Sequence, residues 1–336
     1  MGIKKNILVV GGCGYIGSHM VKCLLEAEHN VTVLDDLSTG FRDSLLGGRL
    51  VEEDFGSRAV LDELFGNSGF DGVLHFASLI LVGESVIDPA RYYRCNVSKT
   101  LTLLEAMKDH KVQNLIFSSS AALFGEPQYL PIDEDHPRNP INPYGMTKQM
   151  VEIMLKDFAR AYGLNSVALR YFNAAGADPE ARIGERHDPE THLIQLALRA
   201  ASGVLPVLQL FGQDYDTPDG TCIRDYIHVD DLSDAHLLAL EYLWSGGETT
   251  AFNLGNGDGF SVNQVIDEVE NVSGTSVPIV FASRRAGDPA RLVANSSRAK
   301  AMLGWKPKYT NLQQIVSHAW RWEQQSKKLL VQQSLS

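Results

Sequence analysis

The sequence predicts an α/β protein with a doubly wound, mainly parallel sheet and a smaller α+β lobe on its C-terminal side. Short apolar runs alternate with amphipathic stretches through the first half, which is the pattern of βαβ units. The first apolar run ends in a cluster of glycines, and from about residue 174 the alternation stops and prolines recur. We therefore expect a Rossmann-type domain at 1–173, a substrate-binding lobe mainly at 174–326 with segments returning to the first domain, and a frayed tail at 327–336.

The strands and helices of the first half follow from apolar periodicity. Strands are expected where short runs are rich in β-branched and other apolar residues, at 6–10, 31–34, 49–53, 72–76, 113–118 and 165–171. Helices are expected where apolar residues recur with helical spacing, at 15–27, 57–65, 88–96, 98–110 and 143–162.

The second half predicts helices and strands without a regular alternation. Helices are expected at 191–202, 229–243, 262–272 and 312–324, and strands at 207–211, 251–254 and 278–281. Ser261 and Gln264 have the spacing of a capping box at the start of the third of these helices.

Composition limits the partners and the cellular setting. The 336 residues carry a formal net charge of −11, so nucleic acid and an anionic membrane surface are poor partners. No stretch is long enough to span a membrane, and the first apolar run is too short for a signal peptide. The four cysteines are scattered without CxxC spacing, which predicts a reducing cytoplasm, no disulfide framework and no structural zinc.

The glycine turn after the first strand predicts a dinucleotide site. Residues 5–17 read KNILVVGGCGYIG, so a strand, a glycine turn and a helix follow one another directly. Gly11, Gly14 and Gly17 permit a close approach of the backbone to a pyrophosphate, and the helix N-terminus offers free N–H groups. Asp35 ends the second strand, where an acid hydrogen-bonds a ribose 2′-hydroxyl. Because a 2′-phosphate would meet like charge there, we predict NAD as the cofactor.

Tyr144 and Lys148 form the pattern YxxxK near the start of a long predicted helix. The i, i+4 spacing puts the phenol and the ammonium on one helix face. A tyrosine has a reference pKa of about 10, but a neighbouring ammonium and an oxidised nicotinamide would lower that pKa. The phenolate can then accept a proton from a sugar hydroxyl. Ser120, in a serine cluster just past a predicted strand, can orient the same oxygen.

These motifs together resemble the extended short-chain dehydrogenase/reductases that act on nucleotide sugars. The resemblance covers about residues 6–324. Related dehydratases and decarboxylases carry acidic residues after the serine cluster, where this chain has Ala121 and Ala122. The resemblance narrows to the UDP-glucose 4-epimerase family through HFASLILVGES (75–85), FSSSAALFGE (117–126), NPYGMTK (142–148), LRYFNAAGA (169–177) and LFGQDYDTPDGTCIRDYIHVDDL (210–232).

The resemblance implies a role for each matching residue. Tyr144 would be the base, Lys148 the cofactor clamp and Ser120 the hydroxyl on the sugar O4, and no metal is expected. For His192 a capping or surface role suits the sequence equally well. Cofactor contacts are implied for Gly11, Gly14, Tyr15, Ile16, Gly17, Asp35, Asp54, Phe55, Phe76, Ala77, Asn96, Ser118, Tyr144, Lys148 and Tyr171. Substrate contacts are implied for Ser120, Tyr144, Asn173, His192, Leu193, Phe211, Arg224, Tyr226, Arg285, Asp288 and Leu292.

The implied reaction is a redox-neutral interconversion of UDP-galactose and UDP-glucose. Hydride passes from C4 to tightly bound NAD, the 4-keto sugar rotates, and the hydride returns to its other face. Four alternatives stay open: a 4-epimerase acting also or mainly on UDP-N-acetylhexosamines, one acting on a UDP-pentose, a simple reductase, and a non-catalytic NAD-binding protein. In the family, bulk at the position of Leu292 is thought to gate the N-acetyl group.

The resemblance also implies a homodimer. Two predicted helical regions, 88–110 and 143–162, have apolar residues on both sides. In the family such helices pair between subunits into a four-helix bundle. The alternative is that these apolar faces only cover the sheet.

Overall fold

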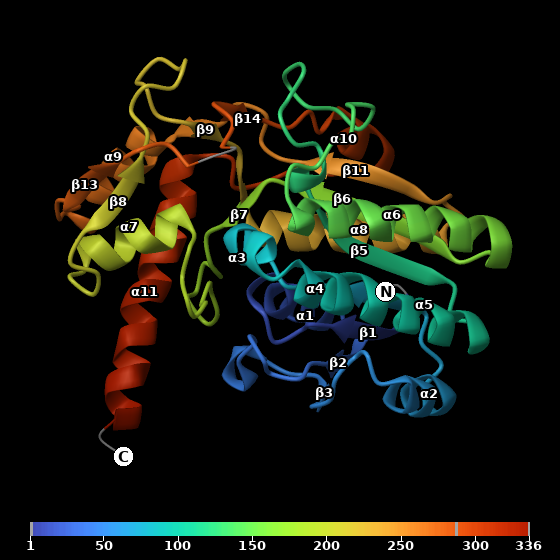
Figure 1. The fold of residues 1–336 in the computed structure, drawn as a ribbon. Coiled ribbons are helices and arrows are strands. Elements are labelled where there is room, and N and C mark those ends of the chain that lie inside the picture. The colour runs from blue at the N-terminus through green and yellow to red at the C-terminus, as the bar shows by residue number, and fades with distance from the viewer. Residues whose placement is uncertain (1–2, 286–287, 335–336) are drawn as a thin grey trace.

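A computed structural model describes residues 3–285 and 288–334 of the chain. Its centre is a seven-stranded sheet in the order β11-β6-β5-β4-β1-β2-β3, in which all neighbours are parallel (Figure 1). This arrangement confirms the predicted Rossmann-type α/β class. The strands are β1 (Asn6–Val10), β2 (Asn30–Leu34), β3 (Arg49–Val51), β4 (Gly72–His75), β5 (Asn114–Ser120), β6 (Asn165–Tyr171) and β11 (Thr250–Leu254).

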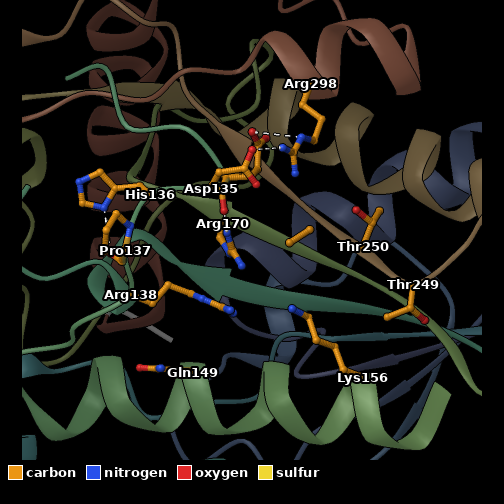
Figure 2. A pocket seen from close by; sticks show the side chains of 12 residues that line it. Asp135, His136, Pro137, Arg138, Gln149, Lys156, Arg170, Thr249, Thr250 and Arg298 are labelled. Carbon is orange, nitrogen blue, oxygen red and sulfur yellow. Dashed lines mark hydrogen bonds and ion pairs between the residues drawn. The ribbon is translucent and has the colours of Figure 1, made fainter. Parts of the chain in front are cut away.

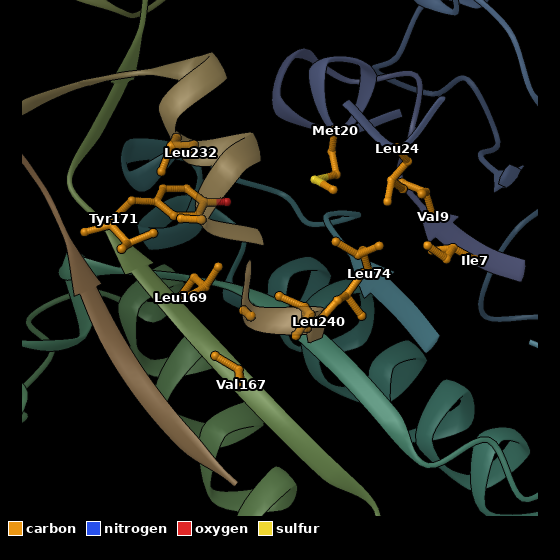
Figure 3. Packing of buried hydrophobic residues seen from close by; sticks show 14 of the residues in the cluster. Ile7, Val9, Met20, Leu24, Leu74, Val167, Leu169, Tyr171, Leu232 and Leu240 are labelled. Carbon is orange, nitrogen blue, oxygen red and sulfur yellow. The ribbon is translucent and has the colours of Figure 1, made fainter. Parts of the chain in front are cut away.

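Helices cover both faces of this sheet, and each face has its own apolar core. On one face Met20 and Leu24 pack with Leu232 and Leu240 over the strands (Figure 3). The continuous apolar runs of the strands follow from this double coverage, because neither face meets water. The first face is covered by α1 (Tyr15–Glu26), α8 (Val229–Trp244) and α10 (Ser297–Leu303), and the second by α2 (Arg58–Asn67), α5 (Lys99–Asp109) and α6 (Pro143–Tyr162).

The second lobe packs three helices against a two-stranded sheet. Its core is separate from the two cores of the main sheet, and in Figure 1 its long C-terminal helix lies beside the other two. The elements of the lobe core are α7 (Leu193–Ala201), α9 (Val262–Ser273), α11 (Leu312–Ser334), β8 (Leu208–Phe211) and β13 (Ile279–Ala282). Short strands link the lobe to the main sheet, namely β7 (Asn173–Ala175), β9 (Ile223–Arg224), β10 (Tyr226–His228), β12 (Phe260–Ser261) and β14 (Arg291–Leu292).

Most predicted elements are present, and the differences lie mainly in connecting segments. The capping box of Ser261 and Gln264 is present. Instead of two helices broken near residue 97, α4 (Pro89–Tyr92) runs through a π-helical turn at Tyr93–Ser98 into α5. The helix α3 (Val82–Ile87) was not predicted, because its six residues are too few to show a periodicity.

The C-terminal helix is longer than predicted. It continues to Ser334, so residues 327–334 are helical where a frayed tail was expected, and residues 335–336 lie outside the described part. Within residues 3–285 and 288–334, no helix has both the length and the apolar character needed to cross a membrane.

Candidate active site

The glycine turn lies between β1 and α1, beside the end of β4. The strand order reverses here, because β2 and β4 flank β1, and ligands of doubly wound sheets bind at such a point. Gly11 has φ +80°, and a Cβ on it would lie 2.4 Å from the Ala77 nitrogen. A Cβ on Gly17 would lie 2.1 Å from the Gly11 carbonyl oxygen. No side chain caps the start of α1 at Gly14, so the N–H groups of Tyr15 and Ile16 face a cradle that fits a pyrophosphate.

Asp35 lies at the end of β2 and is tied to the glycine turn. Its carboxylate accepts hydrogen bonds from the Cys13 N–H at 2.8 Å and from the Leu37 N–H at 2.9 Å. Burial raises the pKa of Asp35 in spite of these two bonds. The structure therefore holds an acceptor beside the turn, where an adenosine ribose would meet it.

Other predicted cofactor residues lie where β3 and β4 end. Asp54 accepts a hydrogen bond from Lys99 at 2.8 Å, and Lys99 also lies over the Phe55 ring. Asn96 is buried, and its side-chain amide forms two hydrogen bonds of 2.9 Å with the backbone of Leu79. Lys99 was missed by the sequence analysis, because its partner lies 45 residues earlier in the chain.

Further predicted cofactor residues follow β4 and end β6. The ring of Phe76 lies 4.9 Å from that of buried His236, and Tyr171 lies 6.0 Å from the same ring. The hydroxyl groups of Tyr171 and Ser118 are hydrogen-bonded. His236, on α8, was also missed, and no local pattern marks it.

Ser120, Tyr144 and Lys148 meet where β5 ends and α6 begins. Asn142 caps α6 by accepting the Gly145 N–H at 2.8 Å, and Pro143 occupies the first turn. A Cβ on Gly145 would lie 2.4 Å from the Ala122 carbonyl oxygen, so only glycine lets this turn approach the segment after Ser120.

The three side chains lie near one another. Ser120 is close enough to Tyr144 for its hydroxyl to lower the pKa of the phenol by hydrogen bonding. The Lys148 Nζ atom lies 5.7 Å from the centre of the Tyr144 ring and donates to the Ser118 carbonyl oxygen at 2.8 Å.

Burial dominates the electrostatics around Ser120, Tyr144 and Lys148, which we call the reacting corner. It lowers the pKa of Lys148 to about 7, although Glu152 opposes the shift. It also raises the pKa of Tyr144, and the hydrogen bond with Ser120 offsets this only in part. The protein groups alone therefore raise the tyrosine pKa, whereas the lowering that we expected from the sequence also includes the charge of a bound nicotinamide. The physical reason is that desolvation disfavours both the phenolate and the ammonium that was to stabilise it.

A buried ionic network lies directly under the reacting corner. Glu152, one helical turn after Lys148, accepts from Arg170 at 2.6 and 2.8 Å and from the Ser119 hydroxyl at 2.7 Å. Glu152 and Arg170 are each 3% exposed. This network was not predicted from the sequence, although the i, i+4 spacing of Lys148 and Glu152 indicates that the two side chains share a helix face.

The predicted nucleotide-binding residues come together in two pairs. Arg224 on β9 forms an ion pair with Asp288. The Arg285 guanidinium lies over the Phe211 ring at 4.0 Å. Leu292 pairs with Arg224 between β14 and β9, and it packs against the small cluster that includes Ala121.

Asn173 and Tyr226 are neighbours on the paired strands β7 and β10, and the Asn173 amide donates to the Asp225 carbonyl oxygen at 3.2 Å. His192 and Leu193 stand at the start of α7. The His192 Nδ1 atom lies 2.6 Å from Glu185, so this ring turns toward two glutamates of the preceding loop. The Tyr15 hydroxyl donates to the Gly176 carbonyl oxygen at 2.7 Å, so only the backbone of Tyr15 faces the glycine turn.

A pocket of about 540 Å³ opens at a different place, between α6 and the β6–β11 side of the sheet (Figure 2). Its wall includes Arg138, Lys156, Arg170 and Arg298 together with acidic Asp135. No residue that we predicted for the cofactor or the substrate is among its lining residues in the described part of the chain. The pocket is connected to the reacting corner only through Glu152, because two of its lining residues, Arg138 and Arg170, form ion pairs with that carboxylate.

Comparison with known proteins points to one family. The model of the NAD dependent epimerase/dehydratase family matches residues 7–255. The UDP-glucose 4-epimerase of Halalkalibacterium halodurans is 50% identical to this chain, over 95% of this chain and 96% of its own length.

Solved structures agree along nearly the whole chain. The crystal structure of UDP-glucose 4-epimerase from Brucella ovis in complex with NAD superposes with a TM-score of 0.93 at 50% identity, covering 94% of this chain and 98% of that one. The enzyme from Bifidobacterium longum in complex with NAD⁺ and UDP superposes with a TM-score of 0.91 at 35% identity, covering 96% and 99%.

Proposed function

Because the chain belongs to the NAD dependent epimerase/dehydratase family, we propose that it interconverts UDP-galactose and UDP-glucose by inverting the configuration at C4 of the hexose. The observation that carries the proposal is that Ser120, Tyr144 and Lys148 lie near one another at the sheet edge that also holds the glycine turn. The similar proteins named UDP-glucose 4-epimerase support the substrate, and their identity extends over nearly the whole chain.

NAD is the cofactor of this proposal, and its glycine cradle and Asp35 fit a dinucleotide. When bound, NAD takes up the C4 hydride and gives it back. The residues of this chain handle the proton. Tyr144 accepts the O4 proton and later returns it, and Ser120 donates a hydrogen bond that orients O4. When protonated, Lys148 places a positive charge beside the phenol.

Inversion requires that the nucleotide be held while the sugar turns. Arg224 is suited to the diphosphate, because a guanidinium forms two charge-assisted hydrogen bonds to such a group. Phe211 offers a ring face to the uracil, and Arg285 and Asp288 lie beside these two residues. Small Ala121 and Ala122 follow Ser120 and supply no acid, which favours epimerisation over elimination.

An NMR time course tests this function. Purified protein is mixed with UDP-galactose without added cofactor. We expect conversion to an equilibrium mixture with UDP-glucose and no net change in absorbance at the reduced-nicotinamide band. Net consumption of added NAD, or conversion of a UDP-pentose alone, would contradict the proposal. If neither sugar nucleotide reacts after NAD is added, the proposal is wrong.

We also propose a homodimer formed through α5 and α6. Leu101, Met150 and Ile153 are 37–49% exposed on these helices. Leu104 and Met107 of α5 are instead fully buried against the sheet, so covering the sheet accounts for only part of the apolar surface of these helices. Light scattering tests the dimer, with Ile153→Glu as the variant that should give monomers.

A cytoplasmic location is also part of the proposal, and the four free cysteines support it.

A further inference from the structure

The loop between β7 and α7 brings two glutamates and two histidines to one point. They are Glu185, His187, Glu190 and His192, and one donor atom of each lies within 4.8 Å of the other three. None belongs to the Ser120–Tyr144–Lys148 corner, although His192 is one of the residues for which the resemblance implied a substrate contact. The spacing is E-x-H-x-x-E-x-H, so a single tight loop supplies all four side chains.

Three of the four distances among these atoms are close to those around one shared cation, and the fourth, 2.6 Å, would lengthen when a cation binds between the two groups. The His192 Nδ1 atom lies 2.6 Å from Glu185 and 3.3 Å from Glu190. The His187 Nδ1 atom lies 3.4 and 3.8 Å from the same two carboxylates. Tetrahedral zinc, with ligands at about 2.0–2.2 Å, places neighbouring ligand atoms about 3.4 Å apart.

Ion pairs satisfy these groups only in part: the histidines face the two glutamates, and the Arg199 guanidinium lies 3.7 Å from the Glu190 carboxylate. The Glu185 and Glu190 side chains are only 2% and 1% exposed. Within residues 3–285 and 288–334, Glu185 Oε1, Glu190 Oε2 and the Nδ1 atoms of His187 and His192 are buried without a hydrogen-bond partner. Atoms this close that do not point along hydrogen bonds to one another are arranged as ligands that converge on a common centre. Buried carboxylate oxygens left unpartnered are otherwise costly.

We propose that these four side chains bind one structural Zn²⁺ ion. Two carboxylates and two neutral imidazoles neutralise a divalent cation, and imidazole nitrogen is a preferred zinc ligand. The chain fills all four positions, so no position is left for a substrate or a water, as in structural rather than catalytic sites. The expectation of no structural zinc depended on the cysteines, which take no part here.

The surroundings support a role in fixing the loop. The Glu190 Oε1 atom accepts the N–H groups of Thr191 at 2.8 Å and His192 at 3.0 Å, which orients the carboxylate as outer contacts of metal sites do. The Glu185 carbonyl oxygen accepts from the Trp322 indole of α11 at 3.0 Å. The His187 ring meets Tyr15 of α1 edge-on at 6.2 Å. The ion would therefore join the second lobe to the helix that starts at the glycine turn.

Metal analysis of the tag-free, full-length protein tests this site. The protein is loaded with ZnCl₂, dialysed against metal-free buffer and analysed by plasma mass spectrometry. We expect about one zinc per chain. Co²⁺ in place of Zn²⁺ should give the visible absorption of a tetrahedral site. EDTA should lower the melting temperature by several degrees.

Variants locate the ion. His187→Ala and Glu190→Gln should lose at least nine-tenths of the zinc and the cobalt absorption. His110→Ala is the matched control, because His110 also contacts a carboxylate, that of Asp62 at 2.9 Å, outside the cluster. Equal zinc in His187→Ala and the control would overturn the proposal.

Zinc content and cobalt absorption of the wild-type protein test the proposal even if a variant fails to fold. Less than about a tenth of a zinc per chain, with no cobalt absorption, would mean that the cluster is a set of ion pairs between protonated histidines and glutamates. These readouts do not depend on turnover. A zinc-loaded protein that fails to epimerise would contradict the proposed function and leave the metal site standing.

Discussion

The reacting corner and the nucleotide end of the proposed site are held by elements of very different length. Ser120 ends a seven-residue strand and Tyr144 starts a twenty-residue helix, and both belong to the main sheet and its cover. Arg224 and Leu292 lie on strands of two residues each. Proton transfer needs atoms fixed to within tenths of an ångström, and long packed elements give that precision.

The nucleotide end has a different task. Its two arginines already have partners within the protein, since Arg224 forms an ion pair with Asp288 and Arg285 lies over the Phe211 ring. An entering nucleotide must therefore exchange these contacts for its own. Substitutions at the corner should therefore change the rate constant of the reaction, whereas those at the nucleotide end should change binding.

Tyr144→Phe should give the largest effect. It removes the group that accepts the O4 proton, so kcat should fall by about 10²–10⁴-fold while the affinity for UDP changes little. Steady-state kinetics and UDP titration measure the two quantities. Tyr162→Phe, an exposed tyrosine at the other end of α6, is the control and should behave as wild type. Full activity of Tyr144→Phe would refute our assignment of the base.

Glu152→Gln tests whether the corner depends on its buried support. Burial raises the pKa of Glu152, but Arg170 and Ser119 outweigh this and hold the pKa below its usual range. The ionised carboxylate therefore contributes stability above its unfolded-state pKa, and this contribution is lost as the pH falls through the folded-state pKa. The free energy of unfolding near neutral pH should drop by about 3–5 kcal/mol.

Denaturant unfolding measures this loss, and Glu105→Gln on the exposed side of α5 is the control. The difference between wild type and Glu152→Gln should shrink on acidification. A difference that stays constant at all pH values would show that the ionised state of Glu152 is not what stabilises the corner.

Arg224→Ala should weaken binding at the nucleotide end. Loss of a charge-assisted contact costs about 1.5–3 kcal/mol, so KM for UDP-galactose should rise roughly tenfold to a hundredfold with kcat nearly unchanged. Arg291→Ala, an exposed arginine on the paired strand β14, should leave both constants alone. If Arg224→Ala lowers kcat instead of raising KM, the contrast between the two ends fails.

The depressed pKa of Lys148 predicts a pH dependence of stability. In the folded protein this pKa is about 7, against 10.5 for an ordinary lysine. Between these values the unfolded chain holds the extra proton, so stability from this group rises with pH by up to about 1.4 kcal/mol per unit. Below pH 7 both states are protonated and the slope disappears.

Urea unfolding of wild type and Lys148→Met measures this slope. The difference in stability between the two proteins should change in favour of wild type between about pH 7 and about pH 9. Parallel curves would mean that Lys148 keeps an ordinary pKa.

Leu292→Tyr should give the smallest effect. Leu292 packs beside the segment after Ser120, so a larger side chain there narrows the space around the sugar. Activity on UDP-N-acetylgalactosamine should fall about tenfold relative to UDP-galactose. NMR time courses of the two substrates give the ratio, with Leu292→Ile as the volume-matched control. An unchanged ratio for Leu292→Tyr would show that this position does not gate the N-acetyl group.

Local pattern was sufficient for the class of fold and for much of the site. The bounds of β1, α6 and β6 agree with their predicted ranges, because their strand and helix signals are continuous. Tyr144 and Lys148 lie one helical turn apart, so their meeting required only that the helix form. Glycine at positions 11 and 17 likewise indicated the close backbone contacts that the structure contains.

The sheet, the glycine turn and the YxxxK helix follow from local sequence, since each is encoded within a few neighbouring residues. Tertiary structure decided which distant groups meet. Arg224 and Asp288 form an ion pair although they are 64 residues apart. Glu152 accepts hydrogen bonds from Arg170 and Ser119, which lie on two different strands. It also decided the state of the reacting groups, because the burial that lowers the pKa of Lys148 and raises that of Tyr144 comes from the packing of α6 on the sheet.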